Sequence, residues 1–470
     1  MAITKKTLGF VDLAFYAASA ALSIRWISVA AAAGPASLWI WVLAVVVFSG
    51  PLIVATAELT TRFPGEGGVY VWTVVAFGPF WGFLCGWLYW MSNLPFFSAM
   101  LVFMLNLLAA AMGPAGKALT GSPWLFTSAA VALSLAVGGL HYLGLGTGKW
   151  LSNIGGATNI ALVGLLILVG ALAFARHGPA TNFAGANYAP PLDANGAILW
   201  ATMVFGVGGT EALAFLRNDV RGGMRTVLGV LACVAVAQIV FYVAGTAAML
   251  AILSPGAATR LSGLPDALIL GLNTLGFGHL APAVLIGGFL CLLGSYSAWF
   301  GVGARLPFAA GLDAVLPAAF GRRDPKSGAP VVSIAVQTVV VAVIVVISQA
   351  GDTLKGAYDF LVAMSVLSYT LPFLFLFAVF LVMQGKAARA RPAPSDAWRT
   401  PGGPRVALAI GGVGMGATIL AVACTLVPSP DARDQAWEIA KLVLVSAVLV
   451  LSGVAAHALA RRRGRRIKAD

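Results

Sequence analysis

Long apolar stretches recur along the whole chain and are separated by short polar or Gly/Pro-rich segments. Each stretch has about 20 residues or more, the length at which an α-helix crosses the hydrocarbon core of a bilayer. The pattern predicts twelve spans, at about 10–33, 38–61, 80–112, 124–144, 151–175, 196–216, 227–253, 281–308, 331–350, 358–384, 405–427 and 435–459. Composition agrees, because only 10% of the residues are charged, whereas roughly a quarter are charged in soluble proteins.

The basic residues are distributed unevenly between the two sides that these spans define. If the N-terminus is cytoplasmic and the sides alternate, 21 of the 29 Lys and Arg residues fall on the inner side and six on the outer side. Positive residues accumulate on the cytoplasmic side of membrane proteins. We therefore expect a multi-pass protein of the plasma (inner) membrane with both termini in the cytoplasm. The pI of 9.9 then reflects helix ends in contact with the bilayer, and we expect no nucleic-acid partner.

Two predicted spans that lie five helices apart are interrupted near their middle. The first carries Ser23 and Arg25, and the sixth carries residues 206–209, Gly-Val-Gly-Gly, followed by Glu211. Discontinuous helices at corresponding positions of two halves point to a substrate site at the membrane midplane. Glycine is also frequent where membrane helices pack closely. Spacing alone therefore leaves both a binding site and close helix packing open.

Three segments resemble the amino acid–polyamine–organocation (APC) superfamily of permeases. Residues 58–72 and 76–82 are similar to the family's segment between helices 2 and 3. Residues 305–317 are similar to its R-x-x-x-x-x-A-x-D-x-x-x-P run after helix 8, and Gly209-Thr210-Glu211 to the G-x-E of helix 6. Within the superfamily, the chain looks most like the bacterial amino acid antiporters and the L-type and polyamine carriers.

The resemblance implies an all-α polytopic membrane protein with a LeuT-like 5+5 inverted repeat and two added C-terminal helices. Residues 1–470 would form one transmembrane domain, with the first repeat at 10–175, the second at 196–384 and the added helices at 405–459. The implied function is secondary active transport, by permeation or exchange, of amino acids or related carboxylate-bearing metabolites through alternating access. The alternatives are a polyamine or other organic-cation carrier of the same fold and a non-transporting membrane amino acid sensor.

The sequence contains no metal-ligand cluster, nucleophile motif or phosphate-binding loop. We therefore expect no enzymatic activity, no cofactor and no metal site. The expected partners are a small amino acid-like solute and the lipid bilayer.

The same resemblance assigns candidate substrate contacts. By analogy with the arginine–agmatine antiporter group, they are Ser23, Ile24, Arg25, Asn93, Phe205, Gly206, Val207, Gly208, Gly209, Trp299 and Ser365. Each isolated aromatic or serine also fits simple helix packing. The first span departs from the family, because it lacks the glycines whose bare amides bind the substrate carboxylate there.

Arg25 and Glu211 lie in the two interrupted spans, where ionisable residues are costly and indicate function. In one interpretation Arg25 pairs with a substrate carboxylate, which favours anionic or zwitterionic solutes. In another, Arg25 and Glu211 neutralise each other permanently and hold the broken helices. In a third, Arg25 extends to the outer face. Glu211 is also a candidate carrier of a coupling proton.

Asp313 follows the eighth span and lies near Arg305 and Arg322 in sequence. This cluster is either the latch of an inward gate or a topological anchor. The coupling ion stays open between a proton, sodium and none, because Ser295 and Ser297 are weak indications of a sodium site.

Overall fold

The structure is a computed structural model of the 470-residue chain. It describes residues 9–63, 68–143, 149–211, 213, 223–309, 315–325, 329–350, 352–386, 394, 397–430 and 432–462. Within these ranges every regular element is a helix.

The helices of the first half follow the predicted spans but divide them further. They are α1 (Phe10–Ala21), α2 (Arg25–Ala32), α3 (Ala36–Ala44), the π-helix η1 (Val45–Ser49), α4 (Gly50–Arg62), α5 (Val69–Phe77), α6 (Pro79–Met91), α7 (Asn93–Ala111), α8 (Pro114–Gly121), α9 (Pro123–Tyr142) and α10 (Lys149–His177).

The second half continues in the same way, with short 3₁₀ turns in its connections. The helices are α11 (Ala194–Gly206), α12 (Gly223–Ile252), α13 (Gly263–Thr274), α14 (Ala281–Ala309), α15 (Val331–Gln349), α16 (Leu354–Val382), α18 (Gly403–Thr425) and α19 (Gln435–Arg462). The 3₁₀ turns are η2 (Gly185–Tyr188), η4 (Gly278–Leu280) and η6 (Ala318–Gly321).

Within the described ranges, 10 helices are long and apolar enough to cross a membrane. The two other predicted spans are the interrupted ones. The first divides into α1 and α2 around residues 22–24, and the sixth stops being α-helical after Gly206. The difference from twelve continuous spans therefore falls where the polar residues and glycines of the sequence interrupt the apolar pattern.

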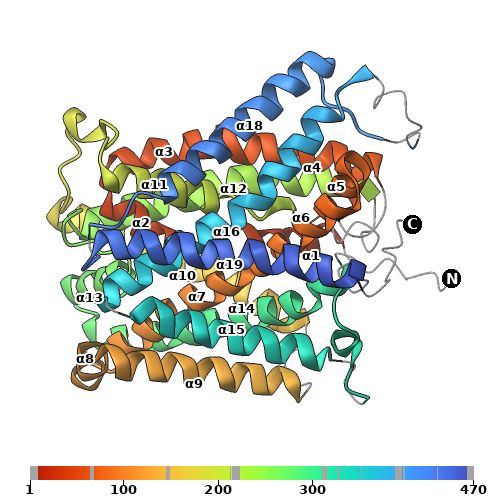
Figure 1. The fold of residues 1–470 in the computed structure, drawn as a ribbon. Helices are drawn as coiled ribbons and strands as arrows, with labels where there is room; N and C mark the ends of the chain where they lie inside the picture. Colours follow the sequence, from red (N-terminus) through yellow and green to blue (C-terminus); the bar gives the residue numbers. More distant parts are fainter. Residues whose placement is uncertain are drawn as a thin grey trace.

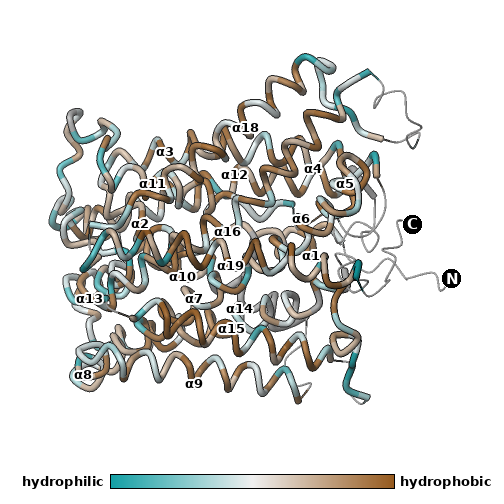
Figure 2. Tube along the Cα trace, in the orientation of Figure 1, coloured by the Kyte–Doolittle hydropathy of each residue, from teal (hydrophilic) through white to brown (hydrophobic). Residues whose placement is uncertain are grey.

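The long helices run side by side, with the short helices α8 and α13 at one end of the bundle and α5 at the other (Figure 1). Hydrophobic residues extend along the helices, and hydrophilic residues gather at the two ends (Figure 2). α12 packs against α1, α2, α3 and α10, and α16 packs against α5, α6, α7 and α18. α12 therefore contacts both parts of the first interrupted span, and α16 contacts α6 and α7.

Gly245 lets α12 approach α2 closely. A Cβ atom at this position would lie 2.4 Å from Cδ1 of Ile27, well inside van der Waals contact. The absence of a side chain therefore places the backbone of α12 directly beside the first interrupted helix.

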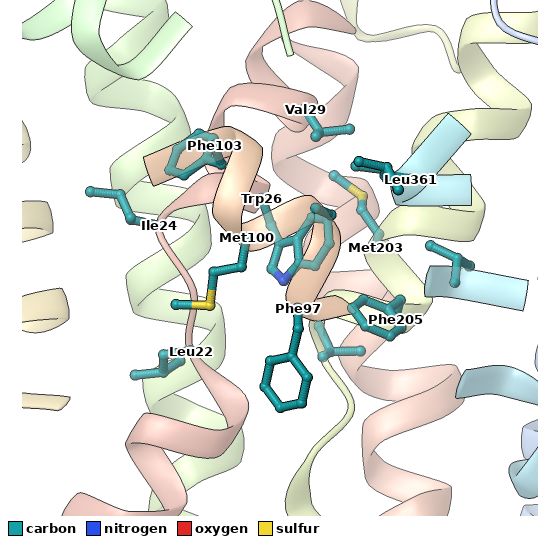
Figure 3. Close-up of a cluster of buried hydrophobic side chains, with 14 of the residues drawn as sticks. Leu22, Ile24, Trp26, Val29, Phe97, Met100, Phe103, Met203, Phe205 and Leu361 are labelled. Atoms are coloured by element: carbon teal, nitrogen blue, oxygen red, sulfur yellow. The ribbon is translucent and has the colours of Figure 1, made fainter. Parts of the chain in front are cut away.

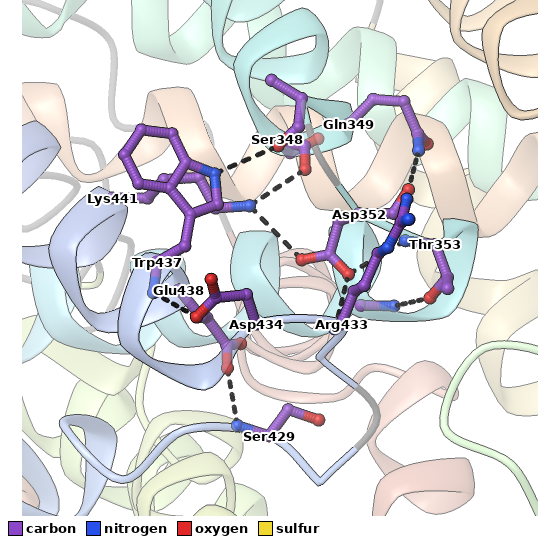
Figure 4. Close-up of polar contacts among 12 residues, drawn as sticks. Ser348, Gln349, Asp352, Thr353, Ser429, Arg433, Asp434, Trp437, Glu438 and Lys441 are labelled. Atoms are coloured by element: carbon purple, nitrogen blue, oxygen red, sulfur yellow. Dashed lines mark hydrogen bonds and ion pairs between the residues drawn. The ribbon is translucent and has the colours of Figure 1, made fainter.

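The last helix is fastened by a buried ion pair at one end of the bundle (Figure 4). Lys441 Nζ lies 3.3 Å from Asp352 Oδ2, and the two side chains are only 3% and 2% exposed. The Arg433 N–H donates to Asp352 Oδ1 over 3.3 Å. These contacts join α19 to the connection between α15 and α16.

A second polar network lies beside it and joins five segments of the chain. Arg260 pairs with Asp359 over 2.5 Å and donates to Asn195 Oδ1 over 2.8 Å. The Ser429 hydroxyl donates to the same Asp359 carboxylate, and the Ser429 N–H donates to Glu438 Oε2. The network holds α11, α16 and α19 together at this end.

Replacing Lys441 by Met should lower the melting temperature of the purified protein. Removal of one member of a buried ion pair leaves the other charge without compensation and costs about 3 kcal/mol or more. Lys117→Met, at an exposed position, is the matched control and should change stability by less than about 0.5 kcal/mol. Equal melting temperatures for Lys441→Met and the parent would contradict the stabilising role of this pair.

Candidate functional site

A cavity lies between the two interrupted helices. Its volume is about 90 Å³. The walls come from the break between α1 and α2, the junction of α6 and α7, the segment after α11, and from α10, α12, α14 and α16. Segments from both halves of the chain therefore build one site.

Eight of the residues proposed from the sequence line this cavity: Ser23, Asn93, Phe205, Gly206, Gly208, Gly209, Glu211 and Trp299. Ile24, Arg25, Val207 and Ser365 are buried but do not line it. The Ser365 hydroxyl instead donates to the Leu361 carbonyl of its own helix over 2.6 Å. Asp313 lies outside the described residues. The roles assigned to all of these residues stay predictions.

The cavity also includes side chains that the sequence analysis did not select as substrate contacts. They are Trp26, Tyr89, Phe96, Asn159, Tyr242, Ser295 and Tyr369, with Ala21, Leu22, Ser92 and Met100. A tyrosine in an otherwise apolar span was the available signal for Tyr89, Tyr242 and Tyr369. That signal is weak, because tyrosines are common at membrane interfaces as well.

Glu211 is completely buried and is held by three hydrogen-bond donors. The Tyr369 hydroxyl donates to Oε1 over 2.5 Å and the Tyr89 hydroxyl over 3.2 Å. The Gly209 N–H donates to Oε2 over 3.0 Å. Gly209 has a φ of 94°, a left-handed conformation that favours glycine. The glycine thus permits the turn that directs its own N–H towards the carboxylate two residues later.

The lining has a one-sided electrostatic character. Among the described residues that line the cavity, Glu211 is the only carboxylate, and none is Lys, Arg or His. Aromatic rings supply much of the remaining wall, and their faces attract cations. A carboxylate beside aromatic faces is suited to an ammonium group.

Three rings meet at the cavity wall and connect the two interrupted helices with α16. Trp26 and Phe205 contact edge to face with centroids 5.1 Å apart, and Phe205 contacts Tyr369 with centroids 4.7 Å apart. Figure 3 shows Trp26 between Met100 and Phe205. The two breaks are therefore packed together through aromatic side chains.

Arg25 lies behind this wall and is only 1% exposed. Its guanidinium carbon is 3.9 Å from the centroid of the Trp26 ring and 4.8 Å from that of Phe96. None of its three guanidinium nitrogens has a hydrogen-bond partner among the described residues. The structure thus contains no ion pair between Arg25 and Glu211, and Arg25 does not reach the outer surface.

The comparison with known proteins identifies the family. Residues 8–451 match the model of the amino acid permease family. An uncharacterised transporter of Legionella pneumophila is 26% identical over 427 residues, 90% of each chain. Shorter matches include a polyamine transporter of rice, 36% identical over 26% of this chain and 22% of that protein. A probable agmatine/putrescine antiporter of Lactococcus lactis is 39% identical over 15% of each chain.

Solved structures give the fold. A manganese transporter of Eremococcus coleocola superposes with a TM-score of 0.56 at 13% identity, over 97% of this chain and 94% of that chain. At this identity the likeness concerns the fold alone, and it confirms the predicted all-α, LeuT-like class. With the family match over nearly the whole chain and transporters among its relatives, the protein belongs to the amino acid permease family of the APC superfamily and is a multi-pass secondary membrane transporter of small solutes.

Proposed function

We propose that this transporter moves amino acids or related carboxylate-bearing metabolites by alternating access, and that Glu211 binds the ammonium group of the cargo. The observation that carries the proposal is the position of Glu211. It is the only carboxylate among the described lining residues, and it lies in the segment after α11. Tyr89 and Tyr369 orient it, while Phe205, Asn93 and Trp299 provide the surrounding contacts.

The carboxylate of the cargo is proposed to bind at the start of α2. The Ser23 N–H already donates to Tyr242, and the Trp26 and Ile27 N–H groups donate to the Ser23 and Ile24 carbonyls. The groups proposed to receive the carboxylate are therefore the Ile24 and Arg25 N–H groups, at the positive end of the helix dipole. α2 begins at Arg25, immediately after Ser23, which lines the cavity, and Ile24. Counted from the N-terminal side of the span, these three residues take the place of the family's glycines, whereas counting back from Gly34 and Pro35 puts residues 19–21 there. The Arg25 guanidinium adds a positive charge directly behind the Trp26 and Phe96 rings of the wall.

A second candidate function is the transport of polyamines or other organic cations. The observation in its favour is the absence of Lys, Arg and His among the described lining residues. The short similarities to a rice polyamine transporter and a Lactococcus lactis agmatine/putrescine antiporter point the same way. Both functions use the same ammonium site, and they differ in whether the cargo needs a carboxylate. A sensor that binds such a solute without moving it is the third alternative.

We further propose that Glu211 exchanges its partner during the transport cycle, binding a proton when the ammonium group leaves. A buried carboxylate that loses its counter-ion is strongly favoured to take up a proton. This would couple transport to protons by symport or exchange. The uneven distribution of Lys and Arg supports placing the protein in the plasma membrane with both termini in the cytoplasm.

Uptake into proteoliposomes should distinguish the two substrate classes. A labelled amino acid should be taken up, and unlabelled amino acids should compete at least ten times better than the amines obtained by removing their carboxylate. The reason is that the amines leave the N-terminus of α2 without an anion. Stronger competition by the amines would favour the organic-cation function. Thermal stabilisation by a solute that never enters the liposomes would support the sensor instead.

Glu211→Gln should weaken binding and uptake of the cargo roughly 10- to 100-fold, because a hydrogen bond to a charged group contributes about 1.5–3 kcal/mol. The measurement is the cargo-dependent rise in melting temperature, together with the initial rate of uptake. Asp193→Asn is the control at the start of α11, where Asp193 accepts from the Gly196 N–H at an exposed position. Uptake by Glu211→Gln equal to that of the control would rule out Glu211 as the ammonium site.

Arg25→Met should separate the effect of this buried cation on the stability of the protein from its effect on cargo binding. Without cargo, the variant should melt at a higher temperature than the parent, because a buried charge without hydrogen bonds is destabilising. Its affinity for the amino acid should fall, whereas its affinity for the corresponding amine should stay the same or rise. Arg176→Met, at an exposed position of α10, is the control. A parallel loss of both affinities would contradict a carboxylate-specific role.

A further inference from the structure

The helix α12 carries two polar side chains one turn apart in an otherwise apolar stretch. Gln238 and Tyr242 are both completely buried. They lie on the helix that packs against α1, α2 and α3. Each forms hydrogen bonds with backbone groups at the breaks of the interrupted helices.

The Tyr242 hydroxyl connects the two breaks directly. It accepts a hydrogen bond from the Ser23 N–H over 3.1 Å. It lies 2.8 Å from the Gly206 carbonyl oxygen and 3.2 Å from that of Ala21. A hydroxyl has one proton to donate, so the shorter contact to Gly206 is its main donor bond. One side chain thus links an N–H of the first break with a carbonyl of the second.

Gln238 binds the second break at Val207, the residue after the Gly206 that Tyr242 binds. Its Nε2 donates to the Val207 carbonyl over 2.9 Å and lies 3.5 Å from the Ala21 carbonyl. Its Oε1 accepts from the Ser49 hydroxyl over 2.8 Å. The carbonyl partners require the N–H₂ group on their side and the oxygen towards Ser49. The amide orientation is therefore fixed by the hydrogen-bond network.

The ring of Tyr242 is itself held in place. Trp41 stacks on it with a centroid distance of 4.0 Å and an interplanar angle of 9°. The Trp41 indole N–H donates to the Thr246 hydroxyl over 3.1 Å. The position of the Tyr242 hydroxyl is thus determined by contacts with α3 and by its own helix.

These bonds fix the backbone next to the groups that are proposed to hold the cargo. Backbone groups freed by an interrupted helix must find partners inside a membrane, because unsatisfied ones are expensive. Ser23 and Gly206 both line the cavity. The Ser23 N–H and the Gly206 carbonyl oxygen are kept at a fixed separation by the hydroxyl between them. Gln238 does not line the cavity, so it can act only through the backbone that it holds.

We propose that Gln238 and Tyr242 are positioning residues that set the distance between the carboxylate-binding and ammonium-binding ends of the cargo site. This inference rests on the proposed function, in which the break before α2 receives the carboxylate and the segment after α11 receives the ammonium group. It adds a specificity rule. The parent selects cargo by the number of carbon atoms between its two charged groups, and loss of the bridge relaxes that selection.

The test compares uptake of a series of ω-amino carboxylic acids and α-amino acids by proteoliposomes containing the full-length protein. Tyr242→Phe removes only the bridging oxygen, and Gln238→Leu removes the second clamp. Each variant should raise KM for the preferred cargo about tenfold, change kcat less, and flatten the ranking across the series. Thr418→Val is the matched control, because it loses a buried hydroxyl that donates to the Gly414 carbonyl of its own helix, α18, and contacts neither break. It should keep the ranking and stay within about twofold of the parent's KM.

A melting curve of each variant shows whether it is folded. If Gln238→Leu does not fold, Gln238→Glu tests the same contact, because its carboxylate still accepts from Ser49 but brings no amide N–H to the Val207 carbonyl. Folded Tyr242→Phe and Gln238 variants with the parent's KM and ranking would overturn the inference and leave the proposed function standing. A parent that takes up no member of the series, and no amino acid at all, would overturn both.

Discussion

The structure of the cavity depends on hydrogen bonds from one helix to the broken ends of two others. Interrupting a helix inside an apolar bundle frees N–H and carbonyl groups that water cannot reach everywhere. Gln238 and Tyr242 provide partners for the carbonyls of Gly206 and Val207 and for the Ser23 N–H. With these groups satisfied, the two interrupted segments can both turn and leave space between them. The cavity is a consequence of that arrangement.

Arg25 and Glu211, the ionisable residues at the two breaks, have opposite surroundings. Glu211 receives hydrogen bonds from two tyrosine hydroxyls and from the Gly209 N–H. Arg25 contacts aromatic faces and has no hydrogen-bond partner within the described residues. The Glu211 carboxylate is thus preorganised at the cavity surface, while the Arg25 guanidinium is buried behind the aromatic wall of the cavity. This arrangement is the basis of the proposed cargo, a solute that carries both an ammonium and a carboxylate group.

One end of the bundle is held by charge, and its middle by close approach. Lys441 with Asp352, and Arg260 with Asp359, join the last helix and the second half at one end. Gly245 brings α12 against Ile27, so that the polar side chains of α12 reach the first break. The helices that support the site are therefore fixed along their length, and the interrupted segments between them carry the chemistry.

The sequence by itself determined the helices, the two breaks and most of the polar groups at them. These are local properties: a run of apolar residues has to be long enough to cross the bilayer, and glycine or polar residues interrupt it. The sequence could not pair Glu211 with Tyr89 and Tyr369, which are 122 and 158 residues away. It also allowed an Arg25–Glu211 pair that the fold does not make. Such contacts depend on how separate helices rotate and approach each other, so only the tertiary structure decided them.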